Sequence, residues 1–408
     1  MSQFDATGRV DVDVIDLARR LISAPSPNPP GDETAVVPVV AEAADQLGLP
    51  TAVTVARAEH RPNLVITLDF GPGGRHLALC GHIDTKPVGD ADWSVDPYAA
   101  DIDGDRLYGL GSGDMKAAIA AMLVAAGRLT QSPPERGRLS IVLAADEEDG
   151  AYYGAQYLAA QQAVRPDGIV IGEPGGIQDD YDRLHLVSRG IARMRVVANG
   201  RQGHSSLSGR AGVRNAGVDA ARAVTAIADD LTLAIPDNAD GLAGWDATVN
   251  TGLRTQGGVG FGVLPGRVAV DTEVRLLPAM QREKLVAAFE TALERVRTAT
   301  GADLRLEFDA PPNDWLPPAH VPADDALATA AAAACGRTFG TTPPLSVFPG
   351  TTDATWFDTV QGVPTLPALG PGLLERAHGA NEWVSIAAVR KTVELYESLA
   401  RDYLVGGE

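Results

Sequence analysis

The segment RHLALCGHID, residues 75–84, decides the fold class of this chain. It joins a short apolar run, LALC, to a histidine and an aspartate that follow within four positions. Three more short, partly β-branched runs occur in the first half of the chain, and an alanine-rich stretch between two of the runs is typical of a helix. Alternating strands and helices indicate a mostly parallel sheet that is covered by helices. The predicted strands are residues 63–69, 75–80, 139–144 and 168–171, and the predicted helix is residues 115–128.

The chain before this sheet is predicted to form two helices. Apolar residues at helical spacing favour a helix over residues 11–22. That helix must end at APSPNPPGDE, residues 24–33, because four prolines and a glycine prevent its continuation. A second helix is expected over residues 33–47, with Pro38 either in its first turn or at a kink.

The pattern changes near residue 185, where a second kind of domain begins. Residues 184–198 alternate apolar and polar positions, as a half-exposed strand does, and two helices and two further strands follow. We therefore expect an α/β domain built from residues 1–184 and 311–408, interrupted by an inserted α+β domain over residues 185–310. The later predicted elements are helices at 211–231, 281–298, 324–335 and 387–403 and strands at 267–276 and 302–308.

The composition excludes several classes of protein. Fifty-three acidic residues against 34 lysines and arginines give a formal charge of −19, which disfavours binding to nucleic acids and anionic membranes. Two cysteines, Cys80 and Cys335, are too few for a disulfide framework or a cysteine-rich zinc site. The N-terminal residues lack the pattern of a signal peptide, and no apolar run is long enough to span a bilayer. We expect a soluble, cytoplasmic protein.

Histidine and carboxylate side chains stand where the predicted strands end and where the predicted helix begins. Because open α/β sheets bind ligands at the carboxyl ends of their strands, we expect these side chains to meet at one edge. Each one alone has a structural explanation, such as a helix N-cap for Asp114. Their coincidence at one edge favours a functional site. The residues are His82, Asp84, Asp114, Glu147, Glu148 and Glu173.

The types of side chain at this edge indicate a metal site. Imidazole and carboxylate ligands without thiolates suit Zn, Mn or Co. Hydrolases with two metal ions need a carboxylate between the ions and a base that deprotonates the attacking water. Neighbouring side chains of an extended segment point in opposite directions, so one of Glu147 and Glu148 can bind metal while the other faces the water. Asp84 can accept a hydrogen bond from the imidazole of His82 and fix its orientation.

Four motifs resemble, in their order and spacing, those of a known di-zinc family. They are GHIDTKPVGD (81–90), GLGSGDMKAA (109–118), ADEEDG (145–150) and IGEP (171–174). The family contains acetylornithine deacetylase, succinyl-diaminopimelate desuccinylase, aminoacylases, glutamate carboxypeptidases and dipeptidases. The resemblance runs from SAPSPNPPGDE (23–33) to AHGANEWV (377–384) and so covers nearly the whole chain.

The resemblance implies a role for each residue at this edge. Glu147 is similar to the general base of the family, and Asp84 is similar to the residue that orients His82. The role of His378 is implied by the resemblance alone. The implied ligands of the first metal ion are His82, Asp114 and Glu173, and those of the second are Asp114, Glu148 and His378.

The inserted domain resembles the lid and dimerisation domain of the family. The resemblance implies that His204, in GHSS, reaches the active site of the partner subunit and polarises the scissile carbonyl. Arg275 resembles an arginine that faces the substrate carboxylate, with a strand-surface arginine as an equal alternative. Thr352, in GTTD, lies in a segment that resembles one near the family's substrate pocket. Gly262 stands where the family often has asparagine, which leaves the substrate specificity open.

These implications together predict an enzyme. We expect a homodimeric amidohydrolase with two zinc ions, which cobalt or manganese can replace, acting on a small N-acyl amino acid as a deacetylase or desuccinylase does. A metallo-dipeptidase or carboxypeptidase on the same scaffold is the main alternative. A relative that binds a ligand without turnover is disfavoured, because every implied ligand and the base are present.

Overall fold

The computed structural model of the chain describes residues 12–208, 210, 213–311 and 313–406, which form two compact units. Unit 1 contains the described residues up to Ser188, Asp240–Gly244, and those from Ala319 onwards. Unit 2 contains Arg189–Ala239 and Trp245–Pro318. The division falls after residues 188 and 318, whereas the sequence predicted it after residues 184 and 310. The short return of residues 240–244 to unit 1 is not part of that prediction.

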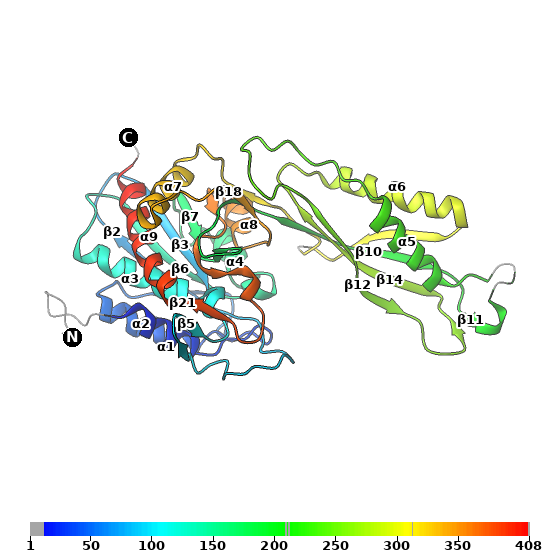
Figure 1. The fold of residues 1–408 in the computed structure, drawn as a ribbon, viewed down its shortest axis with the longest axis horizontal. Coiled ribbons are helices and arrows are strands. Elements are labelled where there is room, and N and C mark those ends of the chain that lie inside the picture. The colour runs from blue at the N-terminus through cyan, green and yellow to red at the C-terminus, as the bar shows by residue number, and fades with distance from the viewer. Residues whose placement is uncertain (1–11, 209, 211–212, 312, 407–408) are drawn as a thin grey trace. The chain divides into compact units, whose positions relative to one another are not determined.

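Unit 1 is built on a six-stranded sheet with the order β1-β2-β6-β3-β7-β19 (Figure 1). Strands β6, β3, β7 and β19 are parallel, whereas β1 and β2 are antiparallel to their neighbours. Strand β3 is buried along its whole length between β6 and β7, which explains its unbroken apolar run. The predicted α/β fold with a mostly parallel sheet is confirmed. The strands are β1 (Val53–Ala56), β2 (Pro62–Asp69), β3 (His76–His82), β6 (Arg138–Ala144), β7 (Gly168–Ile171) and β19 (Thr365–Leu366).

The helices of unit 1 cover this sheet. Helices α3 and α9 both pack on strand β3, and α1, α2 and α7 pack on α3 or α9. Helix α3 is rich in alanine and almost entirely buried, because small side chains allow close packing on its neighbours. None of the helices in the described residues has the length and apolar character needed to cross a membrane. The helices are α1 (Val14–Ile22), α2 (Val36–Leu47, with Pro38 in its first turn), α3 (Ala117–Gln131), α4 (Ala155–Gln161), α7 (Ala326–Phe339), α8 (Ala354–Trp356) and α9 (Ile386–Val405).

Smaller sheets in the described part of unit 1 complete the edge where the parallel strands end. Strands β20 and β21, from the C-terminal segment, contact the turn Ser112–Lys116 that opens helix α3. Strand β20 also pairs with β8, which directly follows Glu173. The C-terminal segment therefore lies beside the residues that the sequence places at this edge. The strands are β4 (Ile102–Asp103), β5 (Arg106–Tyr108), β8 (Pro174–Gly176), β9 (Leu184–Ser188), β17 (Ala319–His320), β18 (Leu345–Phe348), β20 (Gly370–Leu373) and β21 (Trp383–Ser385).

Unit 2 is an antiparallel sheet with two helices. Its strand order is β12-β14-β10-β15, and β16 also pairs with β10. Helices α5 and α6 pack against each other, and both contact the sheet (Figure 1). This arrangement is the α+β unit that the sequence predicts. The elements are β10 (Gly190–Asn199), β11 (Gly203–His204), α5 (Ala216–Asp230), β12 (Thr248–Gly257), β13 (Val263–Leu264), β14 (Arg267–Leu276), α6 (Arg282–Thr300), β15 (Asp303–Phe308) and β16 (Trp315–Leu316).

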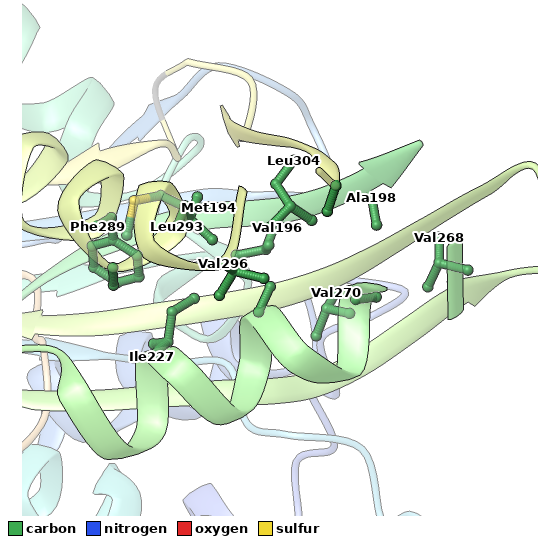
Figure 2. Close-up of a cluster of buried hydrophobic side chains, with 14 of the residues drawn as sticks. Met194, Val196, Ala198, Ile227, Val268, Val270, Phe289, Leu293, Val296 and Leu304 are labelled. Atoms are coloured by element: carbon green, nitrogen blue, oxygen red, sulfur yellow. The ribbon is translucent and has the colours of Figure 1, made fainter. Parts of the chain in front are cut away.

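The core of unit 2 lies between these two helices and the sheet. Figure 2 shows side chains of this core, with Phe289, which is completely buried, toward one end of the cluster. Alternate residues of β10 point into this core, because successive side chains of a strand face opposite sides of the sheet. Unit 2 thus has a hydrophobic core of its own. The labelled residues are Met194, Val196, Ala198, Ile227, Val268, Val270, Phe289, Leu293, Val296 and Leu304.

Two longer strand segments differ from the prediction, and short strands such as β1, β8, β18 and β20 were not predicted either. The single half-exposed strand expected over residues 184–198 is wrong, because the segment forms β9 in unit 1 and β10 in unit 2. All five residues of β9 are buried, and β17 and β18 pair with it along its two edges. Strand β12 was not predicted, because its sequence TVNTGLRTQG is polar and it is largely exposed at the edge of its sheet.

Candidate metal centre and active site

Imidazole and carboxylate side chains from several segments of unit 1 meet at the edge where its parallel strands end. His82 is the last residue of β3, while Glu147 and Glu148 follow β6 and Glu173 follows β7. Potential ligand atoms of His82, Asp114 and Glu148 lie within 4.8 Å of one another, as do those of His82, Glu147 and Glu173. The predicted convergence at this edge therefore appears in the geometry.

Asp114 lies between two histidines. Its Oδ1 is 2.8 Å from His82 Nε2, and its Oδ2 is 3.1 Å from His378 Nε2. His82 Nε2 is also 3.5 Å from Glu173 Oε1, and His378 Nε2 is 3.2 Å from Glu148 Oε2. Each oxygen of Asp114 thus faces a different histidine, and each histidine has a second carboxylate beside it. A carboxylate that bridges two metal ions needs this arrangement.

The turn that carries Asp114 is held by a buried carboxylate, Glu382. Glu382 Oε1 accepts hydrogen bonds from the backbone N–H groups of Gly113 (2.8 Å) and Asp114 (3.1 Å), and Oε2 accepts one from Gly111 (3.1 Å). Burial and the nearby charge of Asp114 raise the pKa of Glu382 to about 8. Because Glu382 follows His378 by four residues, one C-terminal segment supplies an imidazole and also fixes the turn of Asp114.

Asp84 connects His82 with the glutamate pair. His82 Nδ1 lies 3.0 Å from the backbone carbonyl oxygen of Asp84 and 3.5 Å from its carboxylate. The backbone carbonyl oxygen is thus the nearer of the two partners of the imidazole, and the carboxylate contact that the sequence predicted has the longer distance. The carboxylate of Asp84 also accepts hydrogen bonds from the backbone N–H groups of Glu147 (3.2 Å) and Glu148 (3.1 Å). It therefore orients the segment that carries both glutamates.

A buried polar network lies behind Asp84. Asn28 Nδ2 donates to Asp84 Oδ2 (2.8 Å) and to Asp146 Oδ1 (2.9 Å). Arg61 also donates to Asp146 (2.7 Å) and forms an ion pair with Glu33 (2.9 Å). Asp146 directly precedes the glutamate pair and has a φ of +67°. The network therefore fixes the backbone at the point where the chain turns toward the site.

The charges of the cluster suit divalent cations. Burial raises the pKa of Glu147 and of Glu173 well above their usual range, and neighbouring carboxylates add to both shifts. Hydrogen bonds to Asp114 and Glu148 raise the pKa of His378 to about 10. Buried carboxylates so close together repel one another unless cations lie between them. The donor set therefore fits divalent metal ions that prefer nitrogen and oxygen ligands.

The side chain of Thr352, in the GTTD segment of unit 1, makes a local hydrogen bond to the backbone. Thr352 is buried, and its Oγ1 accepts a hydrogen bond from the backbone N–H of Ala354 at 3.3 Å. The next residue, Asp353, is buried too, and burial raises its pKa to about 7. A role for Thr352 in substrate binding stays a prediction.

The other predicted site residues belong to unit 2. His204 is exposed, and its Nδ1 accepts hydrogen bonds from the backbone N–H (3.2 Å) and the hydroxyl (2.8 Å) of Ser206. A neutral His204 therefore carries its proton on Nε2. The carbonyl of Gly262 accepts the N–H of Ser205 at 2.9 Å, so Gly262 lies beside the His204 segment. Arg275 forms an ion pair with Glu273 (2.8 Å) of its own strand. The roles of His204 and Arg275 stay predictions.

Three residues at the centre were not selected by sequence reasoning. They are Asn28, Lys86, which contacts Glu148, and Glu382. Each lies within a segment that carries the family resemblance, namely APSPNPPGDE, GHIDTKPVGD and AHGANEWV. The signal in the sequence that could identify Asn28, Lys86 and Glu382 is their polar side chain inside a segment that resembles the family.

Comparison with known proteins agrees with this geometry. The sequence matches peptidase family M20/M25/M40 over residues 78–402. It is 30% identical over 404 residues to succinyl-diaminopimelate desuccinylase of Rhizorhabdus wittichii, and the alignment covers 96% of this chain and 98% of the relative.

Solved structures share the fold. The M20 family metallo-carboxypeptidase Sso-CP2 of Sulfolobus solfataricus gives a TM-score of 0.74 at 18% identity, covering 97% of this chain and all of the other. The Bacillus subtilis YXEP protein, a dinuclear metal-binding peptidase of family M20, gives 0.68 at 15% identity, covering 96% and 97%. The chain therefore belongs to peptidase family M20/M25/M40, and it is a metal-dependent hydrolase that acts on amide bonds.

Proposed function

We propose that this hydrolase uses two divalent metal ions to cleave the amide bond of a small N-acyl amino acid. The observation that carries the proposal is the position of Asp114 between His82 and His378, with the carboxylate of Glu147 in the same cluster. Zinc is the expected metal, with cobalt or manganese as functional substitutes, because all proposed ligands are imidazole or carboxylate groups.

The proposed ligands form two sets that share Asp114. Divalent ions in hydrolases of this kind acidify water and polarise the carbonyl group of the substrate. The turn held by Glu382 and the backbone contacts of Asp84 keep the ligands in place before the substrate arrives. The first set is His82, Asp114 and Glu173, and the second is Asp114, Glu148 and His378.

Glu147 is the proposed general base. Burial raises its pKa, which brings its proton affinity closer to what proton transfer near neutral pH requires. Its carboxylate takes a proton from water while the water oxygen forms a bond to the carbonyl carbon. The same carboxylate then gives the proton to the amine nitrogen as the carbon–nitrogen bond breaks.

Substitution of Glu147 tests this role. Glu147→Ala is expected to retain its metal content and to lose nearly all turnover, because removal of a general base costs about 10²–10⁴-fold in rate. Metal content is measured by elemental analysis and turnover by release of free amine. Substantial residual turnover in the metal-loaded variant would reject the assignment.

The expected substrate is an N-acetyl or N-succinyl amino acid. The relative from Rhizorhabdus wittichii is named a succinyl-diaminopimelate desuccinylase, which supports an N-acyl amino acid. A panel of N-acetyl and N-succinyl amino acids, assayed beside dipeptides with added zinc, cobalt or manganese, separates the deacylase from a dipeptidase or carboxypeptidase. Faster cleavage of dipeptides across the whole panel would favour the peptidase alternative.

A homodimer with His204 acting on the partner's substrate belongs to the same proposal. Leu207 follows His204 by three residues. Phe261 precedes Gly262, whose carbonyl accepts the N–H of Ser205. Leu207 and Phe261 both expose large apolar side chains. Such side chains suit a surface that a second copy covers. Light scattering is expected to give twice the 42.5 kDa chain mass, and Phe261→Ser is expected to lower both the mass and the turnover. A fully active wild-type monomer would contradict the dimer.

A further inference from the structure

Lys86 places a positive charge on a proposed metal ligand. Its Nζ lies 3.1 Å from Glu148 Oε2 and also donates to the backbone carbonyl of Glu148. Its backbone N–H donates separately to Glu148 Oε1 at 3.1 Å. The Glu148 side chain is only 3% exposed, whereas that of Lys86 is 35% exposed. Lys86 therefore holds a buried carboxylate from the solvent side.

The contact with Lys86 uses the oxygen that the second metal set needs. Glu148 Oε2 is also 3.2 Å from His378 Nε2, so the ammonium and the imidazole meet at one carboxylate oxygen. A lysine ammonium offers three hydrogen-bond donors and no lone pair, so it cannot act as a ligand. It occupies part of the carboxylate and repels a nearby cation.

The two metal sets therefore differ in charge. In the first set, Asp114 and Glu173 lie beside His82, whose imidazole can give up its proton when a metal ion binds. In the second set, Glu148 is paired with the ammonium of Lys86, which lies 3.1 Å from Glu148 Oε2 and adds a positive charge beside the set.

We propose that Lys86 competes with the second metal ion for Glu148, so that the set Asp114–Glu148–His378 binds its ion more weakly and fills after the set His82–Asp114–Glu173. The inference rests on the proposed two-metal centre and adds a determinant of its occupancy. It predicts that removal of the lysine charge increases the affinity for the second metal ion.

The test compares two substitutions of Lys86 with a control at Lys391. Lys86→Met keeps the aliphatic chain and the backbone N–H contact with Glu148 but removes the charge, whereas Lys86→Arg keeps the charge. Lys391 lies on helix α9, where it pairs with Glu394 at 2.7 Å, so Lys391→Met changes the net charge of the chain equally at another position. Each full-length protein is stripped with a chelator and titrated with Zn²⁺ by calorimetry and by equilibrium dialysis.

The expected result is a change confined to the second ion. Lys86→Met is expected to bind the second ion at least tenfold more tightly, which corresponds to about 1.4 kcal/mol of binding free energy. The Kd of the first ion is expected to change less than twofold. Lys86→Arg and Lys391→Met are expected to bind both ions as the wild type does. A misfolded variant would bind both ions more weakly, so structural damage cannot explain a gain in affinity for the second ion.

Other outcomes overturn the inference. One such outcome is that the wild type binds two ions while Lys86→Met binds the second ion no more tightly than the wild type does. That result rejects the role of Lys86 and leaves the proposed function intact. A rise in KM for an anionic substrate without any change in metal affinity rejects it as well and assigns Lys86 to substrate binding. Absence of metal binding in every protein, the wild type included, overturns both proposals.

Discussion

Asn28 joins two carboxylates that support the metal centre without being proposed ligands. Its amide donates one hydrogen bond to Asp84 and one to Asp146, and the side chain is almost completely buried. Asn28→Ala leaves both carboxylates without this donor, so the segment with the glutamate pair loses part of its support. We expect metal affinity to fall about 10–100-fold, as for other residues that position metal ligands. Calorimetric titration with Zn²⁺ measures the loss.

A second buried asparagine provides the control for this prediction. Asn63 donates to the backbone carbonyls of Val55 and Tyr153 and accepts the N–H of Ala145, so its side chain contacts backbone groups. Asn63→Ala is expected to reduce stability to a similar extent, about 1–3 kcal/mol, with little change in metal affinity. Equal loss of metal affinity in both variants would show that Asn28 acts through general stability.

The two kinds of residue at the centre were not equally predictable. His82, Asp114 and the glutamate pair follow from where strands end and helices begin, because a parallel sheet brings those ends together. The contacts of Asn28 and Glu382 join residues far apart in the chain and depend on the path of irregular loops. No periodicity specifies such a path. The resemblance supplied His378, which composition and spacing alone did not distinguish.

At the scale of elements, sequence patterns predicted most of the longer strands with a buried face. They missed β12, which is exposed, and several short strands, among them the buried β18 and β19. Strands β3, β6, β7 and β14 lie close to their predicted ranges because their apolar patterns reflect burial. Strand β12 is specified by its pairing with β14 instead of by apolar side chains. The prediction of one strand over residues 184–198 is wrong because the apolar–polar alternation continues through Arg189, where the chain passes from unit 1 to unit 2.

Strand β9 carries a buried histidine that should make unit 1 sensitive to acid. His185 Nε2 lies 3.0 Å from the carbonyl oxygen of Gly175, and burial lowers the pKa of His185 to about 4. An unfolded histidine has a pKa near 6.5, so below that pH the unfolded chain binds a proton that the folded chain does not. The stability that His185 contributes above pH 6.5 is therefore lost as the pH falls toward 4, by about 2–3 kcal/mol at pH 4.5.

Substitution of His185 isolates this contribution. His185→Gln keeps an N–H donor for Gly175 but does not titrate. Urea unfolding at pH 7.5 and pH 4.5 is expected to show a smaller loss of stability for the variant than for the wild type, since the contributions of other groups cancel in the difference. The same pH dependence in both proteins would contradict a neutral, buried His185.

At the scale of the whole molecule, removal of metal should affect the two units differently, because every proposed ligand lies in unit 1 and unit 2 has its own core. Metal that binds only the folded state stabilises it by about 4 kcal/mol at a free concentration 1,000 times Kd. Calorimetry of the full chain is expected to show two unfolding transitions, of which a chelator lowers only one. Phe289→Ala leaves a cavity in the core of unit 2 and is expected to lower its free energy of unfolding by about 3–5 kcal/mol, so it identifies the other transition. A chelator that lowers the transition sensitive to Phe289→Ala, or lowers neither, would contradict a metal centre confined to unit 1.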